Sequence, residues 1–216
     1  MTKTIAVVDY GVGNLTSVLR GLRRAGLAPV IADSLSSLTN ADGILIPGVG
    51  HFSATTAITD DWRAALLARV RAGVPLLGIC LGMQYLFDSS AEAPDIPGLS
   101  LAQGSCQALI EIGNQFDELI PDFNSNVKVP HLGWNTLIPT PRPSRLLAGI
   151  EPGAFAYFAH SFAAPIGPDT VATTMHGAEF TSVIERGNVF GAQFHPELSA
   201  ETGAAIFANF ARAVAQ

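Results

Sequence analysis

In the first part of the chain, short apolar runs alternate with segments of helical periodicity. Four apolar runs predict buried strands, at residues 4–9, 29–32, 43–46 and 74–79. Between the first two, apolar residues recur at helical spacing after Asn14, which suits an N-cap, and Gly26 suits the position after the helix. Residues 60–72 repeat the helical pattern. Strands joined by helices indicate a parallel sheet covered on both faces, with a ligand site at the carboxyl ends of its strands.

After about Ser90 the pattern changes to loops rich in Pro and Gly, separated by short β-type runs. These runs lie at residues 106–112, 136–138, 155–158, 171–175, 180–185 and 189–194. They predict antiparallel additions to the sheet, with a hairpin at residues 186–188 and a final helix over 200–215. We find no internal repeat and no convincing linker. We therefore expect an α/β fold in a single domain of residues 1–216, with a central, mostly parallel sheet flanked by helices.

Composition narrows the class of protein. The 216 residues are 48% hydrophobic, which is enough for a substantial core, and the net charge is −6. With 12 Lys and Arg and no basic cluster, the chain does not suit nucleic acid or an anionic membrane. The apolar runs have strand length and the N-terminus lacks the layout of a signal peptide, so we expect a cytoplasmic protein. The histidines show no metal-ligand spacing, and we expect no metal and no cofactor.

The clearest candidate for chemistry is Cys80, in the sequence Gly-Ile-Cys-Leu-Gly at residues 78–82. It directly follows an apolar run and precedes a predicted helix through residues 83–87. In the serine version of this strand-to-helix elbow, the glycines permit a strained turn and the next N–H, here that of Leu81, stabilises an oxyanion. The helix N-terminus favours thiolate over thiol. The alternative is a buried, unreactive cysteine.

The segment Gln-Phe-His-Pro-Glu at residues 193–197 supplies the groups that a thiol nucleophile needs. His195 can take and return a proton, and Glu197 can orient its imidazole. At a strand end, a spacing of two residues places both side chains on one face. The alternative is a turn with a solvated glutamate. The second cysteine, Cys106, makes no pair with Cys80 that would suggest a disulfide framework, and the sequence gives it no role.

Together these motifs resemble the class I, triad-type glutamine amidotransferases, whose flavodoxin-like architecture we then expect. Pro-Gly-Val-Gly at residues 47–50 belongs to the same resemblance. Three more segments, at residues 9–15, 129–135 and 158–162, are similar to the glutaminase subunits of imidazole glycerol phosphate synthases. The resemblance runs from about Ile5 to Phe210. It implies hydrolysis of glutamine to glutamate and ammonia by a triad of Cys80, His195 and Glu197.

The resemblance also implies how the substrate is held. The oxyanion hole would use Leu81 and the segment of Val49 and Gly50, which from sequence alone reads as a plain turn. Because glycine tolerates both signs of φ, we hypothesise that this hole is incomplete until a partner orders it. The residues implied for glutamine binding are Gln84, Glu92 and the backbone of His160, Ser161 and Phe162. Without the resemblance, Glu92 reads as a solvated loop residue and His160 as a satisfied, partly buried histidine.

The implied partner is the barrel-shaped cyclase subunit of imidazole glycerol phosphate synthase, in a heterodimer. It uses the ammonia to form imidazole glycerol phosphate and an aminoimidazole carboxamide ribotide in histidine biosynthesis. Trp134 and Asn135 match residues that face the cyclase, although Trp134 alone also suits a core position. The sequence departs from the family pattern at Leu198, where a lysine is common, and at Phe162, where a tyrosine is usual. Two alternatives stay open: an amidotransferase subunit of another synthase, and a noncatalytic scaffold.

Overall fold

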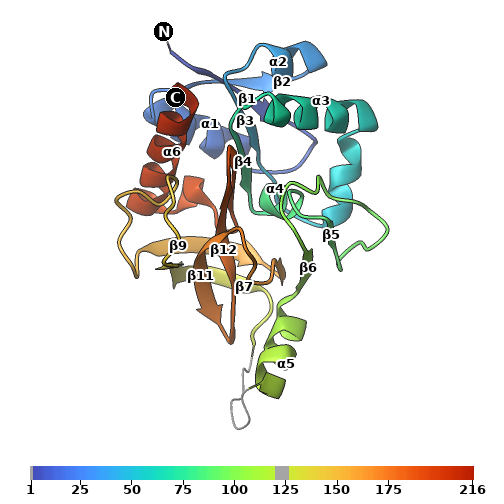
Figure 1. The fold of residues 1–216 in the computed structure, drawn as a ribbon, viewed down its shortest axis with the longest axis vertical. Coiled ribbons are helices and arrows are strands. Elements are labelled where there is room, and N and C mark those ends of the chain that lie inside the picture. Colours follow the sequence, from blue (N-terminus) through green and yellow to red (C-terminus); the bar gives the residue numbers. More distant parts are fainter. Residues whose placement is uncertain (1, 120–126) are drawn as a thin grey trace.

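The computed structural model describes residues 2–119 and 127–216, and its centre is an eight-stranded sheet (Figure 1). The strand order is β2-β1-β3-β4-β13-β12-β11-β8. In this order, the four pairings that join β2, β1, β3, β4 and β13 are parallel. The last three pairings, which join β13, β12, β11 and β8, are antiparallel. The bounds are β1 (Thr4–Val8), β2 (Ala28–Ala32), β3 (Gly43–Ile46), β4 (Leu76–Ile79), β8 (Ile138–Pro139), β11 (Thr170–His176), β12 (Ala178–Arg186) and β13 (Val189–Ala192). The expected α/β class with a mostly parallel sheet is confirmed.

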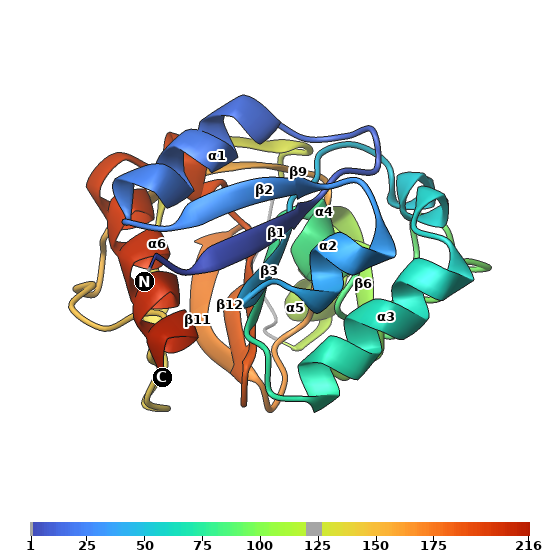
Figure 2. The same cartoon turned by 90° about the horizontal axis from the view of Figure 1, so that it is seen from above.

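Helices cover both faces of the parallel part. Seen from above, α1 (Leu15–Arg24) and α6 (Ala200–Ala215) lie on one side, and α2 (Leu35–Thr39) and α3 (Asp60–Arg71) lie on the other (Figure 2). Side chains along β1 alternate between the two cores: Ile5 and Val7 pack in the cluster of α1 and α6, and Ala6 and Val8 in that of α2 and α3. This two-sided burial explains why the parallel strands are continuous apolar runs.

The local signals for helix ends act as expected at α1. Asn14 Oδ1 accepts a hydrogen bond from the Ser17 N–H at 3.3 Å, which is an N-cap. Gly26 follows the helix with φ of +81°, a conformation that favours glycine. The predicted helices at 60–72 and 200–215 are also confirmed, as is the hairpin, in which Gly187 and Asn188 connect β12 to β13.

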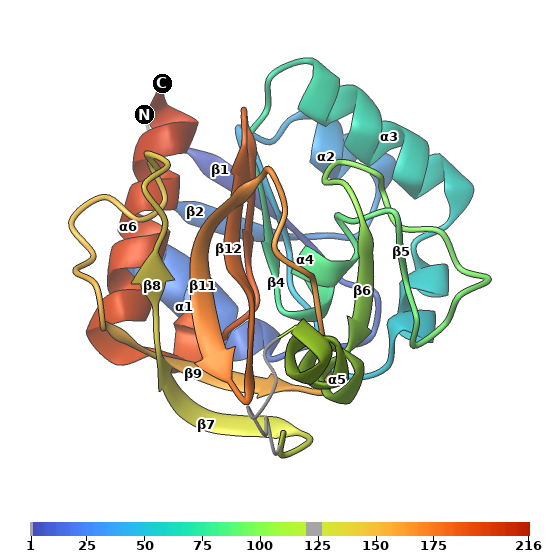
Figure 3. The same ribbon diagram turned by 60° about the horizontal axis from the view of Figure 1, so that its bottom comes forward.

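Within the described residues, two smaller sheets lie outside the main one, and here some of the sequence predictions are corrected. Strands β5 (Ser89–Ser90), β6 (Ser105–Ala108) and β10 (Phe162–Ala163) form one of them, and β7 (His131–Thr136) and β9 (Phe155–His160) form the other. The β7–β9 ribbon passes beneath the main sheet (Figure 3). The run at 106–112 is strand only to Ala108 and continues as α5 (Leu109–Leu119), and the run at 136–138 is interrupted at Leu137, which bonds to Ala154.

The helix after the elbow, α4 (Leu81–Gln84), is shorter than predicted. The carbonyls of residues 85–87, which a longer helix would use internally, accept hydrogen bonds from the loop at residues 98–102: Leu99 N–H reaches Tyr85 O at 2.7 Å and Leu101 N–H reaches Leu86 O at 2.8 Å. Tertiary contacts therefore end this helix. In the part of the chain that the structure describes, two 3₁₀ turns complete the fold, η1 (Phe52–Ala57) and η2 (Pro196–Leu198).

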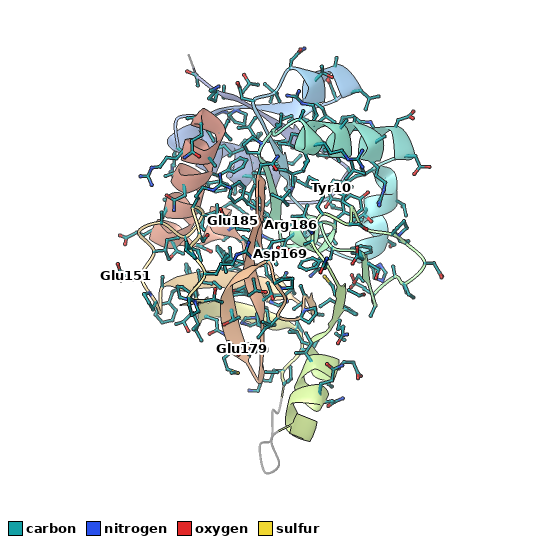
Figure 4. All side chains as sticks on the ribbon, in the orientation of Figure 1. Tyr10, Glu151, Asp169, Glu179, Glu185 and Arg186 are labelled. Carbon is teal, nitrogen blue, oxygen red and sulfur yellow. The ribbon has the colours of Figure 1, made fainter. Side chains whose placement is uncertain are left out.

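Glu185 of β12, labelled in Figure 4, fixes the loop that follows β8. Its carboxylate accepts hydrogen bonds from Ser144 Oγ at 2.7 Å and Arg145 Nε at 2.8 Å. A buried carboxylate is costly unless it is paired in this way. Among the helices of the described ranges, none combines the length and apolar character needed to cross a membrane.

Candidate active site

Cys80 stands at the carboxyl end of β4 in a strained backbone conformation. Its φ is 52° and its ψ is −108°, a region that costs a non-glycine residue about 1–3 kcal/mol. The surroundings hold it there, because Cys80 N–H donates to Ala192 O at 2.8 Å and Gln84 N–H donates to Cys80 O at 3.0 Å. The predicted elbow is therefore present, and Cys80 is 4% exposed.

The glycines on either side of Cys80 are required by close backbone packing. A Cβ at Gly82 would lie 1.9 Å from Ile46 O, and a Cβ at Gly78 would lie 2.6 Å from Gly82 O. Any side chain at either position would push the start of α4 away from β3 and β4. Both glycines thus allow the helix to start directly against the sheet.

His195 and Glu197 form a buried pair beside Cys80. His195 Nδ1 and Glu197 Oε1 are 2.8 Å apart, and both side chains are almost inaccessible to solvent. The expected strand alternation is not the reason: β13 ends at Ala192, and Glu197 lies in the 3₁₀ turn η2. The turn is fixed by Ser199, whose hydroxyl donates to His195 O at 2.6 Å and accepts from Tyr157 N–H at 2.9 Å.

The electrostatics of this pair favour a charged imidazole. Burial disfavours the imidazolium, but the neighbouring Cys80 and the Glu197 carboxylate outweigh burial and raise the pKa of His195 to about 10. Within the described residues, His195 Nε2 and Glu197 Oε2 are buried without a hydrogen-bond partner. Since Glu197 occupies Nδ1, the free Nε2 is the atom available for proton transfer.

Cys80 opens into a cavity of about 350 Å³, a size typical of small-molecule sites. Most of the residues predicted to bind glutamine or its oxyanion line this cavity: Gly50, Leu81, Gln84, Glu92, His160, Ser161 and Phe162. Val49 is not among the lining residues and is 40% exposed. The structure thus brings together segments from four separate parts of the chain.

One of the two N–H donors predicted for the oxyanion hole already makes a hydrogen bond within the protein. Leu81 N–H donates to Gly48 O at 3.4 Å. Gly48 is closely packed, since a Cβ there would lie 2.1 Å from Tyr10 Oη, and the Tyr10 hydroxyl, labelled in Figure 4, donates to Pro47 O at 2.7 Å. Gly50 has φ of +101° with open space around it. The segment is therefore anchored at Pro47 and Gly48 and unconstrained by packing at Gly50.

The two predicted side-chain ligands of glutamine are both engaged. Glu92 is half-buried and lines the cavity. Its Oε2 accepts a hydrogen bond from Phe52 N–H at 2.6 Å, which holds the side chain in place. Gln84 Nε2 donates to Phe162 O at 2.8 Å and to Gln193 Oε1 at 3.2 Å.

Gln193 is a site residue that the sequence analysis did not single out. It is fully buried, and its Nε2 lies 3.8 Å from Cys80 Sγ. Its position two residues before His195 was the available signal. A strand-end residue is as often a core residue as a site residue, so that signal did not suffice.

Trp134 and Asn135 lie on opposite faces of β7. Trp134 is 53% exposed, which excludes the core position, while Asn135 Nδ2 donates inward to Met175 O at 2.9 Å. No group of three or more His, Cys, Asp or Glu residues in the described ranges is arranged to hold a metal ion.

Comparison with known proteins agrees with this geometry. The family model described as glutamine amidotransferase class-I matches residues 6–214. A protein of Deinococcus radiodurans named imidazole glycerol phosphate synthase subunit HisH is 40% identical over 215 residues, covering 98% of this chain and 94% of that protein. The protein of the same name in Halobacterium salinarum is 46% identical over 215 residues, covering 96% of this chain and 92% of that protein.

Solved structures support the fold. A structure titled as a glutamine amidotransferase has a TM-score of 0.72 at 16% identity and covers 98% of this chain and 99% of its own. A structure of PurLQS from Thermotoga maritima has a TM-score of 0.69 at 21% identity, and the match covers 97% of this chain and 98% of that chain. With the family model spanning nearly its whole length, this chain belongs to the class I glutamine amidotransferases.

Proposed function

We propose that this chain is the glutaminase subunit of imidazole glycerol phosphate synthase and works in the cytoplasm as one domain. It hydrolyses glutamine and passes the ammonia to a cyclase subunit. The observation that carries the proposal is Cys80 on a strained elbow, facing a small cavity and beside the buried His195–Glu197 pair. The relatives named above, similar over nearly their full length, support the choice of synthase.

In the first half of the reaction, the Cys80 thiolate attacks the side-chain carbonyl carbon of glutamine and forms a C–S bond. The carbonyl oxygen becomes an oxyanion, for which backbone N–H groups are the stabilising donors. His195, charged because its pKa is raised to about 10, gives its Nε2 proton to the amide nitrogen. The C–N bond then breaks, ammonia leaves, and a γ-glutamyl thioester remains on Cys80.

In the second half, His195 is neutral and accepts a proton from water at Nε2. The resulting hydroxide attacks the thioester carbonyl, and the C–S bond breaks to give the thiolate and the γ-carboxylic acid, which loses its proton to water to become glutamate. Glu197 holds Nδ1 throughout at 2.8 Å, which keeps the free nitrogen aimed at the reaction. One water is consumed and one ammonia is released for each glutamine.

The oxyanion donors are Leu81 N–H and the N–H of Val49. In this structure Leu81 N–H bonds to Gly48 O at 3.4 Å, so the Gly48–Val49 peptide, which carries this carbonyl and the Val49 N–H, must rotate to complete the hole. We propose that the partner promotes this rotation. Gly50→Ala should then reduce partner-stimulated turnover more than substrate binding, because alanine strains a φ of +101°. An unchanged stimulated rate would remove this hypothesis.

The outer face of the β7–β9 ribbon is the proposed contact with the cyclase. Strand pairing places Leu132 beside Ala159 and Trp134 beside Tyr157 on one face. Leu132 is 66% exposed and Phe155 is 59% exposed, so this face is apolar and open. Leu198, at the position where a lysine is common, is also exposed, and we propose that it meets the cyclase through an apolar contact in place of an ion pair.

The experiment is to measure glutamate release from glutamine by the chain alone and with a cyclase subunit carrying its nucleotide ligand. We expect low activity alone, strong stimulation in the complex, and none in either case for Cys80→Ala. Activity that the cyclase never changes would assign another synthase. No activity under any condition, with no labelling of Cys80 by a glutamine-like electrophile, would favour the scaffold alternative.

A further inference from the structure

A line of polar side chains runs from β7 toward the active site. Asn135 Nδ2 lies 3.2 Å from His131 Nε2, and His131 Nδ1 lies 3.0 Å from His160 Nε2. His160 Nδ1 in turn lies 2.9 Å from the carbonyl oxygen of Phe162. Both histidines are buried. The mechanism above gives neither imidazole a role.

The donor of each bond in this line follows from chemistry. A carbonyl oxygen only accepts, so His160 Nδ1 carries the hydrogen. Burial lowers the pKa of His160 and of His131 to about 3, so both are neutral at pH 7 and each has one nitrogen without a hydrogen. His160 Nε2 therefore accepts from His131 Nδ1, and His131 Nε2 accepts from the amide of Asn135. Every bond points the same way, from Asn135 to Phe162.

The carbonyl of Phe162 also receives a hydrogen bond from the other side. Gln84 Nε2 donates to it at 2.8 Å and gives its second hydrogen to Gln193 Oε1 at 3.2 Å. Because Gln193 must accept through its oxygen, its nitrogen faces Cys80 Sγ, 3.8 Å away. Neither amide can be turned over without setting two acceptors or two donors against each other.

We propose that Gln193 is a further catalytic residue, whose amide N–H donates to the Cys80 sulfur, and that Gln84, His160, His131 and Asn135 are positioning residues that fix this orientation. The inference rests on the proposed function, since it concerns the same nucleophile. These side chains connect the β7 strand with the reacting sulfur. Trp134, the neighbour of Asn135 in sequence, lies on the surface proposed to meet the cyclase.

The placement of Gln193 suits this role. Its side chain is fully buried and its Oε1 accepts from Gln84 Nε2 at 3.2 Å, while its backbone N–H donates to Ser182 O at 2.9 Å, so the side-chain amide is held in one place. A hydrogen bond to an ionised group away from water is stronger than one between neutral groups. The amide therefore stabilises the thiolate and fixes the direction of its lone pairs for attack.

The first test uses Gln193→Met, which keeps the length of the side chain and removes the donor, and Gln193→Glu, which leaves only acceptors. The rate of Cys80 alkylation by iodoacetamide is followed against pH by peptide mapping. We expect the pH of half-maximal alkylation to rise by about one unit or more, and kcat for glutamine hydrolysis to fall about 10-fold or more. Gln115→Met, at an exposed position on α5, is the matched control and should change neither.

The second test addresses the line of histidines. Asn135→Asp cannot donate to His131, so it should draw the proton to His131 Nε2, turn His160 to its Nε2–H form and set a lone pair against the Phe162 carbonyl. Asn135→Ala removes the donor without this reversal. In the isolated chain, ¹⁵N NMR should show the Nδ1–H form of His160 in the wild type and its loss in Asn135→Asp. The same variant should alkylate at a higher half-maximal pH than Asn135→Ala.

The outcomes separate the inference from the proposed function. Alkylation profiles and kcat within twofold of the wild type in both Gln193 variants would overturn the role of Gln193, and an Nε2–H or charged His160 in the wild type would overturn the direction of the line. If Gln193→Glu fails to fold, the Met variant decides. A wild type that alkylates as expected but never releases glutamate would instead reject the proposed function.

Discussion

Gly203, in the first turns of α6, should control the geometry of the active site although it touches no substrate. A Cβ built at Gly203 would lie 1.8 Å from Pro196 O, 2.7 Å from Pro196 C and 3.0 Å from Pro196 Cα. All three atoms are backbone, and Pro196 lies between His195 and Glu197. Gly203→Ala therefore acts on the two residues that the proposed mechanism needs aligned.

The size of the displacement follows from the contact. Cβ atoms essentially never approach another heavy atom closer than 3.0 Å, so the Pro196 carbonyl must retreat by about 3.0 − 1.8 = 1.2 Å. A shift of about 1 Å in a catalytic group can cost on the order of 100-fold in rate. Overpacking costs about 1–3 kcal/mol, and alanine returns about 1 kcal/mol of helix propensity. The net loss of stability should therefore be about 0–2 kcal/mol, or up to about 8 °C in Tm.

The assay is glutamate release in the complex with the cyclase, with Tm measured by calorimetry on the same samples. Gly167→Ala is the control, because Gly167 has no atom within 4 Å of the added Cβ and no positive φ. We expect a loss of about 100-fold in kcat/KM for Gly203→Ala and none for the control. Activity of Gly203→Ala within twofold of the wild type would refute the argument that η2 positions the His195–Glu197 pair.

Three further predictions concern charge and contact. Cys80→Ala should lower the pKa of His195 from about 10 toward its ordinary 6.5, measured by NMR, because one of the two groups that favour the imidazolium is removed; an unchanged value would deny the pairing. Burial lowers the pKa values of His131 and His160, so below pH 6.5 the unfolded chain binds more protons than the folded chain. The free energy of unfolding should therefore fall as the pH is lowered from 6.5 toward 3, by up to about 1.4 kcal/mol per pH unit for each histidine. In His160→Gln, the free energy of unfolding, measured by urea titration at several pH values, should fall less steeply as the pH is lowered. A pH dependence identical to that of the wild type would contradict the assignment. Trp134→Ala should weaken cyclase binding about 30-fold, as an interface anchor worth about 2 kcal/mol, with glutamine hydrolysis by the isolated chain unaltered; equal affinity by titration calorimetry would place the interface elsewhere.

The sequence alone was informative wherever a short segment carries its own physical signal. Apolar runs predicted the parallel strands, because burial on both faces leaves no polar positions. Asn14 and Gly26 marked the ends of α1 because capping depends on residues close in sequence. The glycines around Cys80 likewise predicted an elbow, which the structure confirms with a positive φ at the cysteine.

Sequence patterns were wrong where the outcome depended on distant residues. Residues 109–112 read as strand but continue as α5, and α4 ends early because the loop at 98–102 takes the carbonyls that a longer helix would use. His195 and Glu197 were expected to meet through strand alternation. They meet through a 3₁₀ turn that Ser199 and Gly203 stabilise from the start of α6.

The sequence by itself determined the α/β class, the nucleophile elbow and the family of this protein, because these depend on local conformation and on motifs that are contiguous in the chain. Only the tertiary structure decided that Gln84, Phe162 and Gln193 share hydrogen bonds beside Cys80, that Leu81 N–H is turned to Gly48 O, and that Trp134 is exposed while Asn135 faces inward. Such contacts join residues up to 109 positions apart. Hydrogen bonds and burial at that separation are set by how the layers pack, and no local pattern encodes them.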